Sequence, residues 1–218
     1  MLLIYSENTS TRLQYTCKFI FEELLQTSFS LTLHKESFDA HDGPKINYSN
    51  KKIAEAYHIR PSGILFEEGI KVQNIQSSGD GENAVLFKTE NADHAFDIFA
   101  AVFYLISRYE EYLPHTEDMY GRYAHENSIA FKSGFLNIPL VNIWINEFRK
   151  ALQAFLMSLP SGLTAGASTF NFQLPTYLRY RHRLVIQRKR VFKISCRLSP
   201  ATYARADRCM VGHGGRSV

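Results

Sequence analysis

Short apolar or alternating runs recur along the first 90 residues, and each predicts a β-strand. Residues 2–5 are apolar throughout and end at the polar pair Ser6-Glu7, which is typical of a buried strand. Residues 29–33 alternate between apolar and polar side chains, the period of a strand with one buried face. The predicted strands are residues 2–5, 29–33, 45–49, 56–59, 63–66 and 84–88.

Three longer patterns with helical spacing predict helices. The second of them is apolar on nearly every side over residues 96–106, so this helix is expected to be central and buried. The third has Pro139 in its first turn, a position that proline favours. The predicted helices run from a cap at Thr9 or Ser10 to about Gln26, from about Asp93 to Tyr112, and from about Asn137 to Pro160.

The order of these elements indicates the fold class. A strand, a helix and then further strands are typical of an α/β domain, which we expect over residues 1–160 as a small mixed sheet with two to three packed helices. Residues 161–168 are small and polar, as linkers are, and residues 170–175 begin another alternating run. We therefore expect residues 161–177 to be a linker and the first strand of a second domain.

Composition excludes several classes of protein. Of the 218 residues, 45% are hydrophobic and 21% are charged, which is typical of globular rather than disordered chains. The three cysteines lack metal-ligand spacing and do not predict a disulfide framework. The longest apolar stretch, residues 95–106, is too short to cross a bilayer, and residues 2–5 are too short for a signal peptide. We expect a cytoplasmic protein with no membrane partner.

The net charge of +4 conceals a strongly uneven distribution. Residues 178–218 contain nine Arg and two Lys against one acid, a net charge of +10, so residues 1–177 carry −6. A basic end of this kind either binds a polyanion such as nucleic acid, extends the protein surface, or does not belong to the fold.

The densest polar segment is residues 107–118. Arg108 and Glu111 are three positions apart on one helix face, a spacing that suits an ion pair. Glu110 and Glu111 diverge by about 100° around the helix, so they cannot act on one bond as a paired acid and base. A helix end held by salt bridges is the favoured interpretation, and a ligand pocket is the alternative. The candidate binding residues are Arg108, Tyr109, Glu111 and Arg122.

No residue is predicted to be catalytic or to bind a metal. His115, Asp118, His125 and Glu126 are of metal-ligand types, but their spacing matches no metal motif, so we expect a solvated loop. Cys17 lies among apolar helix residues, which predicts core packing rather than a nucleophile.

Four segments taken together resemble a known family. They are residues 2–8, 44–49, 63–67 and 96–113, and the most specific part is Ser-Arg-Tyr-Glu-Glu-Tyr at 107–112. Over about residues 1–177 the chain resembles the uncharacterised N-terminal domain of bacterial polysaccharide deacetylase family proteins. The resemblance implies a following catalytic domain, a distorted β/α barrel that removes acetyl groups from a glycan. In that domain an Asp pair on the first strand and two histidines four apart build a divalent metal site.

The chain departs from this family at the start of the catalytic domain. Pro175-Thr176-Tyr177 is in place, but residues 178–183 read Leu-Arg-Tyr-Arg-His-Arg and both acids are absent. No two of the eight histidines are four positions apart. We therefore expect no cofactor and no deacetylase activity in this chain. The zinc-like divalent metal is expected only for a complete family member.

A shifted reading frame would explain this departure. Codons for residues 179–183, read one nucleotide later, can encode Asp-Ile-Asp-Ile-Ala, the expected catalytic strand. Residues 178–218 are thus predicted to be a non-native, disordered basic tail, and residues 185–218 are predicted to make few contacts with the body. A nucleic-acid-binding tail and an ordinary surface extension are the disfavoured alternatives.

Two further functional hypotheses remain open, namely a binding module without catalysis and nucleic-acid binding through the basic residues of the tail. In a binding module without catalysis, tyrosine rings and Arg108 would stack on and hydrogen-bond a sugar or a partner protein, although a core role is favoured for most of these rings. The aromatics in question are Tyr109, Tyr112, Tyr120 and Tyr123. The expected partners are a glycan or the missing catalytic domain, and nucleic acid is disfavoured.

Overall fold

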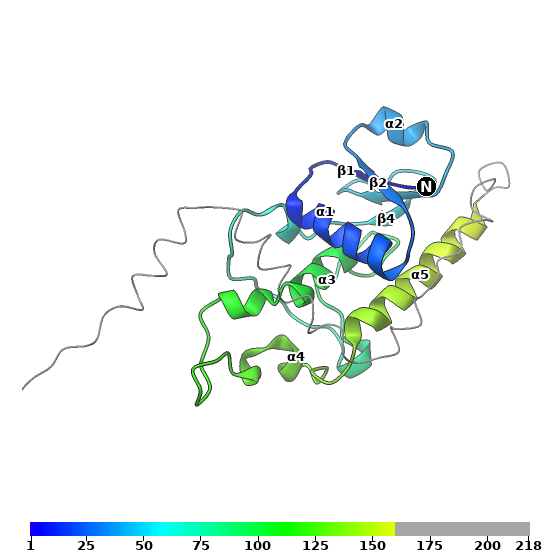
Figure 1. Cartoon of the computed structure of the whole chain (residues 1–218). Coiled ribbons are helices and arrows are strands. Elements are labelled where there is room, and N and C mark those ends of the chain that lie inside the picture. Colours follow the sequence, from blue (N-terminus) through cyan, green and yellow to red (C-terminus); the bar gives the residue numbers. More distant parts are fainter. Residues whose placement is uncertain (160–218) are drawn as a thin grey trace, which may run out of the picture. The chain divides into compact units, whose positions relative to one another are not determined.

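In the described part of the chain, four short strands form a parallel sheet in the order β2-β1-β3-β4 (Figure 1). The computed structural model describes residues 1–159, which belong to one structural unit. The α/β class and the small sheet predicted from the sequence are confirmed, and the pairing is parallel throughout rather than mixed. The strands are β1 (Leu2–Ser6), β2 (Phe29–Thr32), β3 (Lys45–Tyr48) and β4 (Tyr57–Ile59).

In residues 1–159 the strands are joined and followed by five α-helices and several short turns. The α-helices are α1 (Thr11–Cys17), α2 (Lys35–Asp39), α3 (Ile98–Ile106), α4 (Ile129–Lys132) and α5 (Leu140–Ser158). A π-helix, η1 (Lys18–Leu24), continues α1 directly. The 3-10 turns are η2 (Ile64–Phe66), η3 (Gly81–Asn83), η4 (Tyr109–Tyr112) and η5 (His125–Asn127). The predicted cap at Ser10 is confirmed, because its hydroxyl accepts a hydrogen bond from the Leu13 backbone N–H at 3.0 Å.

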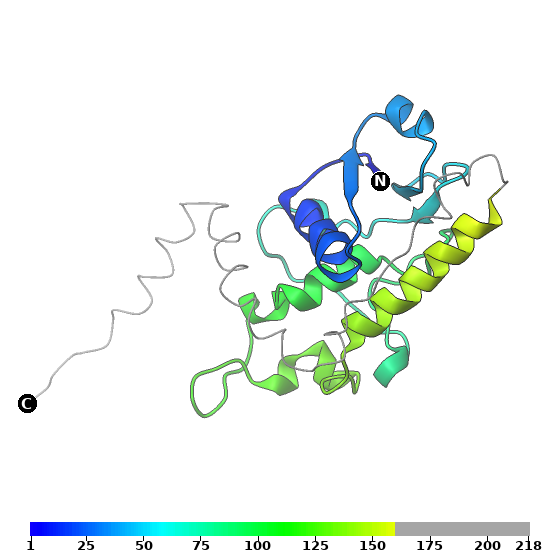
Figure 2. The same cartoon turned by 45° about the vertical axis from the view of Figure 1, so that its right-hand side comes forward.

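The two faces of the sheet carry different layers. Alternate side chains of β1 point to opposite faces, so Leu2 and Ile4 enter the main core with α1, α3 and α5. Leu3 packs on the other face with Phe38 of α2, in a much smaller apolar cluster. Figures 1 and 2 show the same arrangement, with α2 apart from the other helices. The principal core therefore lies between the sheet and α1, α3 and α5.

Helix α3 is the central helix, as its nearly uniform apolar sequence predicts. Seven consecutive residues from Ile98 to Tyr104 are buried. The helix is shorter than the predicted span because Asp97 caps its start, accepting a hydrogen bond from the Ala100 N–H at 3.0 Å. It ends before Arg108, whose φ of +54° is left-handed and cannot continue a helix. The polar segment that follows forms η4 instead.

Two strand predictions, at residues 63–66 and 84–88, are wrong. Gly63 takes a left-handed φ of +101°, which turns the chain into the 3-10 turn η2. Phe87 has a φ of +54°, so residues 84–88 cannot stay extended. That segment takes part only in isolated antiparallel bridges, Ser78 with Val85 and Lys88 with Phe96. Apolar runs of four or five residues are compatible with such buried turns as well as with strands.

Several predictions concern residues 160–218, which lie outside the described part of the chain. They are the linker and strand at residues 161–177 and the basic tail at residues 178–218. Within residues 1–159 none of the helices combines the length and the apolar character that crossing a bilayer requires.

Candidate functional site

The ion pair predicted at the end of α3 is confirmed. Arg108 and Glu111 contact each other through their charged groups, three positions apart across η4. Their side chains are 45% and 29% exposed, so solvent screens the pair and it adds little to stability. This pair fastens the helix end, as the structural interpretation of the segment expected.

Tyr109 belongs to the core rather than to an open pocket. Only 2% of its surface is exposed, and its ring stacks on Tyr104 with centroids 5.3 Å apart. Its hydroxyl accepts a hydrogen bond from the Lys71 backbone N–H at 2.8 Å. Tyr109 therefore ties the loop after η2 to α3. The guanidinium of Arg12, 5.9 Å from the ring centroid, covers the same ring.

Glu110 links η4 to α4. Its Oε1 accepts a hydrogen bond from the Ile129 N–H at 2.9 Å. Burial raises the pKa of Glu110, and the Ile129 N–H opposes that rise because it favours the charged carboxylate. Burial, together with the charge of Glu110, raises the pKa of Tyr123 to about 12. The Glu110 carboxylate thus positions the start of α4.

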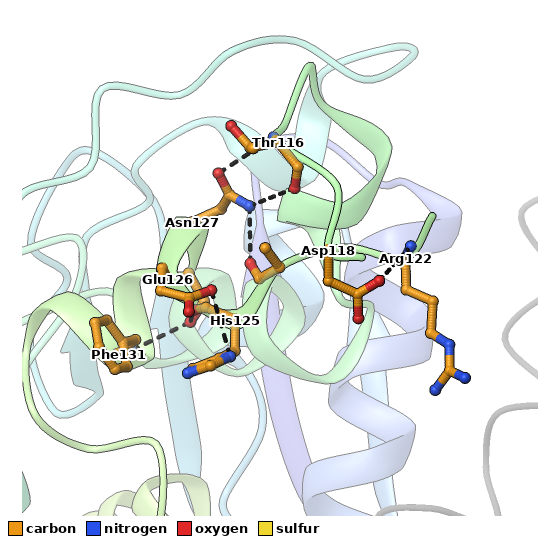
Figure 3. Close-up of polar contacts among 9 residues, drawn as sticks. Thr116, Asp118, Arg122, His125, Glu126, Asn127 and Phe131 are labelled. Atoms are coloured by element: carbon orange, nitrogen blue, oxygen red, sulfur yellow. Dashed lines mark hydrogen bonds and ion pairs between the residues drawn. The ribbon is translucent and has the colours of Figure 1, made fainter. Parts of the chain in front are cut away.

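Between η4 and η5 the chain forms a hairpin, residues 115–124, whose turn is closed by Asp118. The Asp118 carboxylate accepts hydrogen bonds from the N–H groups of Tyr120 and Arg122, at 2.8 and 3.0 Å. Figure 3 shows the bond from Arg122. These bonds lower the pKa of Asp118. The Gly121 N–H donates to the Asp118 carbonyl at 3.0 Å, and the positive φ of Gly121 allows the chain to return. The turn is therefore preorganised.

Asn127 braces the base of the hairpin. Its side-chain N–H₂ donates to the carbonyls of Thr116 and Ala124, both at 2.8 Å, so one amide joins the two arms (Figure 3). The arms also meet in an antiparallel bridge between Glu117 and Tyr123. Because both ends of the hairpin are hydrogen-bonded, its tip is held in one geometry.

The tip presents large side chains to solvent. Met119 is 87% exposed and Tyr120 is 69% exposed. The Arg122 guanidinium lies 5.1 Å from the Tyr120 ring centroid, in a cation–π contact. Figures 1 and 2 show the hairpin projecting from the described body, and in Figure 3 the Arg122 side chain extends away from His125 and Glu126. The tip thus offers an aromatic ring with a guanidinium beside it.

The four candidate binding residues consequently fall into three places. Arg108 and Glu111 pair on the surface of η4, Tyr109 lies inside the core, and Arg122 contacts Asp118 and Tyr120 of the hairpin. Arg122 therefore contacts its own hairpin, whereas Arg108 and Glu111 form an ion pair on η4.

The metal-type residues of this segment also have local contacts. His115 Nδ1 lies 2.7 Å from the Leu113 carbonyl, and His125 lies 3.4 Å from Glu126. In residues 1–159 no three His, Cys, Asp or Glu side chains gather closely enough to hold a metal ion. Cys17 is buried as predicted, and burial raises its pKa far from the range of a reactive thiolate.

A comparison with known protein families identifies the family of this chain. The model of a family of unknown function, DUF7033, matches residues 2–156. The chain belongs to the DUF7033 family. The match spans the whole sheet, the hairpin and all but the last two residues of α5. No curated protein and no solved structure matches the chain.

Sequence reasoning missed the buried carboxylate at the centre of the DUF7033 domain. Asp97 is fully buried and accepts hydrogen bonds from the Tyr48 hydroxyl at 2.9 Å and the Ser62 N–H at 2.7 Å, besides the Ala100 N–H. Burial raises its pKa, and these donors oppose the rise. The first two partners are 49 and 35 positions away, so no local pattern signals them. Asp97 joins β3, the loop after β4 and α3.

A second buried polar cluster lies on the α2 side of the sheet. Asn47 of β3 pairs in register with His58 of β4, and neither is more than 1% exposed. The Ser49 hydroxyl donates to Asn47 Oδ1 at 2.7 Å, and His58 Nε2 lies 2.9 Å from the Ser49 carbonyl. The cluster resembles a Ser–His pair only in composition, because His58 contacts the carbonyl of Ser49 and not its hydroxyl. It supports the loop after β3.

The strand order also defines a switch point that the sequence could not reveal. β2, which follows β1 in the chain, pairs with one edge of β1, and β3 pairs with its other edge, so the direction in which strands are added reverses at β1. In α/β sheets, ligands bind at the carboxyl ends of the strands at such a point. Here Asn50, after β3, donates to the Glu7 carboxylate, after β1, at 3.4 Å, and both side chains are exposed. Glu7 and Asn50 are thus the first exposed polar residues after β1 and β3, the two strands at the switch point.

Proposed function

We propose that the DUF7033 domain is a non-catalytic accessory domain of a polysaccharide deacetylase-like protein. The resemblance of residues 107–112 to the N-terminal domain of that family supports this assignment. The buried carboxylate of Asp97 and the half-buried one of Glu110 support it as well, because both are engaged by backbone N–H groups of the fold. Such carboxylates hold segments in place rather than exchange protons with a substrate.

The catalytic step belongs, on this proposal, to a complete family member. Metal-dependent removal of acetyl groups from a glycan needs the Asp pair and the His pair that residues 178–183 and the histidine spacing do not supply. A zinc-like divalent metal is accordingly assigned to a complete family member and not to this chain.

Sequencing the gene and reading all three frames beyond codon 177 tests the shifted frame. The prediction is contradicted if the frame that encodes residues 178–218 is open and neither of the other two frames encodes the catalytic strand.

The accessory role that we propose is glycan binding at the hairpin tip. The observation that carries it is the exposed Tyr120 ring with the Arg122 guanidinium beside it. Sugar rings have apolar C–H faces that stack on aromatic rings, and their hydroxyl and acetamide oxygens accept hydrogen bonds from a guanidinium. Because the tip is already held by Asp118 and Asn127, binding orders few side chains and costs little conformational entropy.

A protein partner is the second candidate for the same surface. Met119 favours it, because Met, Tyr and Arg are the residues enriched in protein interfaces. The catalytic domain of a complete family member is the partner of that kind that the family resemblance implies. Nucleic-acid binding through the basic tail is the disfavoured alternative, and it concerns residues outside the described part of the chain. It requires an affinity for nucleic acid that falls steeply as the salt concentration rises.

Replacing Tyr120 by Ala is expected to weaken glycan binding about tenfold, because a lost stacking contact of roughly 1.4 kcal/mol corresponds to that factor. The measurement is a titration with N-acetylated chitin oligosaccharides at millimolar concentrations. Tyr112→Ala is the control, since Tyr112 is also exposed, at 45%, but lies on η4 outside the hairpin. Equal losses in the two variants, or no binding by the wild-type chain, would remove the hairpin site.

A further inference from the structure

His94 occupies an aromatic cage between the sheet and α5. It is only 8% exposed, and its ring lies 6.1 Å from Tyr57 of β4, 4.8 Å from Phe96 and 5.4 Å from Phe148 of α5, measured between ring centroids. Three ring contacts from three segments therefore surround one titratable side chain. α5 closes this cage with Phe148, which is fully buried.

The hydrogen bonds of His94 suit a neutral ring. Nδ1 lies 3.0 Å from the Tyr57 hydroxyl, which can donate to it. Nε2 is buried, and within residues 1–159 it has no hydrogen-bond partner. With Nδ1 as the acceptor, the neutral ring carries its proton on Nε2. A second proton would go to Nδ1, would remove the acceptor of the Tyr57 hydroxyl and would place a charge in a buried site. The closed cage therefore disfavours the protonated ring.

Among the described residues, no neighbouring charge compensates that proton. From β4 the facing group is the Tyr57 hydroxyl, and from α5 it is the uncharged Phe148 ring. On the same loop, the Asp93 carboxylate already accepts a hydrogen bond from the His58 N–H at 3.0 Å and pairs with Lys52 at 2.5 Å. Burial alone accounts for the pKa of His94, which it lowers to about 4.

We propose that protonation of His94 releases α5 from the sheet, so that the DUF7033 domain contains an acid-sensitive latch. The latch consists of His94 in the loop before α3 and the Phe148 face of α5. When α5 moves away, water supplies an acceptor for the Nε2 N–H, and Nδ1 takes up a proton at an ordinary pKa of about 6.5. The closed state keeps the ring neutral down to about pH 4.

The sign of the pH effect follows from these two values. Because the folded-state pKa is lowered, the contribution of His94 to closure is complete above about pH 6.5 and is lost as the pH falls toward 4. Between those limits the equilibrium constant for opening is expected to rise about tenfold for each pH unit.

Hydrogen exchange of the full chain at pH 6.5, 5.5 and 4.5, corrected for intrinsic exchange rates, tests the latch. Protection of residues 140–158 is expected to fall about tenfold per pH unit, while that of β1 falls less. In His94→Phe and in His94→Gln, whose side chains stay neutral, protection of α5 is expected to lose this pH dependence. His34→Gln, at an exposed histidine, is expected to keep it. The same pH dependence in both His94 variants, or equal loss of protection in α5 and β1, would overturn the proposal.

Discussion

Replacing Asp97 by Ala is expected to reduce the free energy of unfolding by about 3–5 kcal/mol, measured by urea denaturation. The substitution leaves three buried donors without their acceptor, namely the Tyr48 hydroxyl and the N–H groups of Ser62 and Ala100. Each buried donor without a partner costs roughly 1–3 kcal/mol, and α3 also loses its N-cap. Domains of this size have a free energy of unfolding of only about 5–15 kcal/mol, so this loss is a large fraction of the total stability.

Asp42→Ala is the matched control, because Asp42 is exposed and its loss leaves no buried donor. Its urea midpoint is expected to stay close to that of the wild type.

The pH dependence of the free energy of unfolding provides a second comparison. Burial raises the pKa of Asp97, so this residue lowers stability as the pH rises from about 4 through the raised pKa, and Asp97→Ala is expected to lack that slope. A loss of less than about 1 kcal/mol in Asp97→Ala would show that Asp97 does not join the three segments.

Phe148→Ala is expected to cost about 3–5 kcal/mol, again by urea denaturation. Phe148 is fully buried on α5, and its ring packs against Phe21 and Phe99, both at 6.3 Å, and against Tyr57 at 5.9 Å. Removing the ring leaves a cavity where η1, α3, α5 and the sheet meet, and neighbouring aromatic side chains cannot collapse into it without leaving their rotamers.

Met157→Ala on the same helix is the control for this cavity. Met157 is 82% exposed, so its truncation is expected to change stability by less than about 0.5 kcal/mol. Equal effects of the two substitutions would mean that α5 does not pack on the core through its Phe148 face.

The sequence pattern predicted those elements whose signal is local. β1 to β4 lie where apolar or alternating runs indicated, and each of the three long helical patterns contains a helix. These signals are local, because they consist of side-chain periodicity and, at Ser10, of a hydrogen bond to the helix that it caps. The apolar runs at residues 63–66 and 84–88 carry the same local signal but form turns, since Gly63 and Phe87 adopt left-handed conformations. A left-handed conformation is uncommon for phenylalanine, so the residue type at position 87 does not predict it.

The contacts that organise the domain could not be predicted in this way. Strand order, the buried position of Asp97 and the cage around His94 depend on residues tens of positions apart. The Arg108–Glu111 pair was predictable because three-residue spacing decides it. The hairpin tip also carried a readable signal, since Asp118 followed three positions later by Gly121 is a type I turn pattern.

The central claim is that this domain binds a glycan without deacetylating it, and saturation-transfer NMR on one sample tests both halves. The wild-type chain is mixed with an N-acetylated chitin oligosaccharide and Zn²⁺ or Co²⁺, beside a metal-free control. The account predicts saturation transfer from the protein to the sugar protons, reduced by Tyr120→Ala, and no free acetate signal above the control. Accumulating acetate in the presence of metal, or no transfer to the sugar at all, would contradict it.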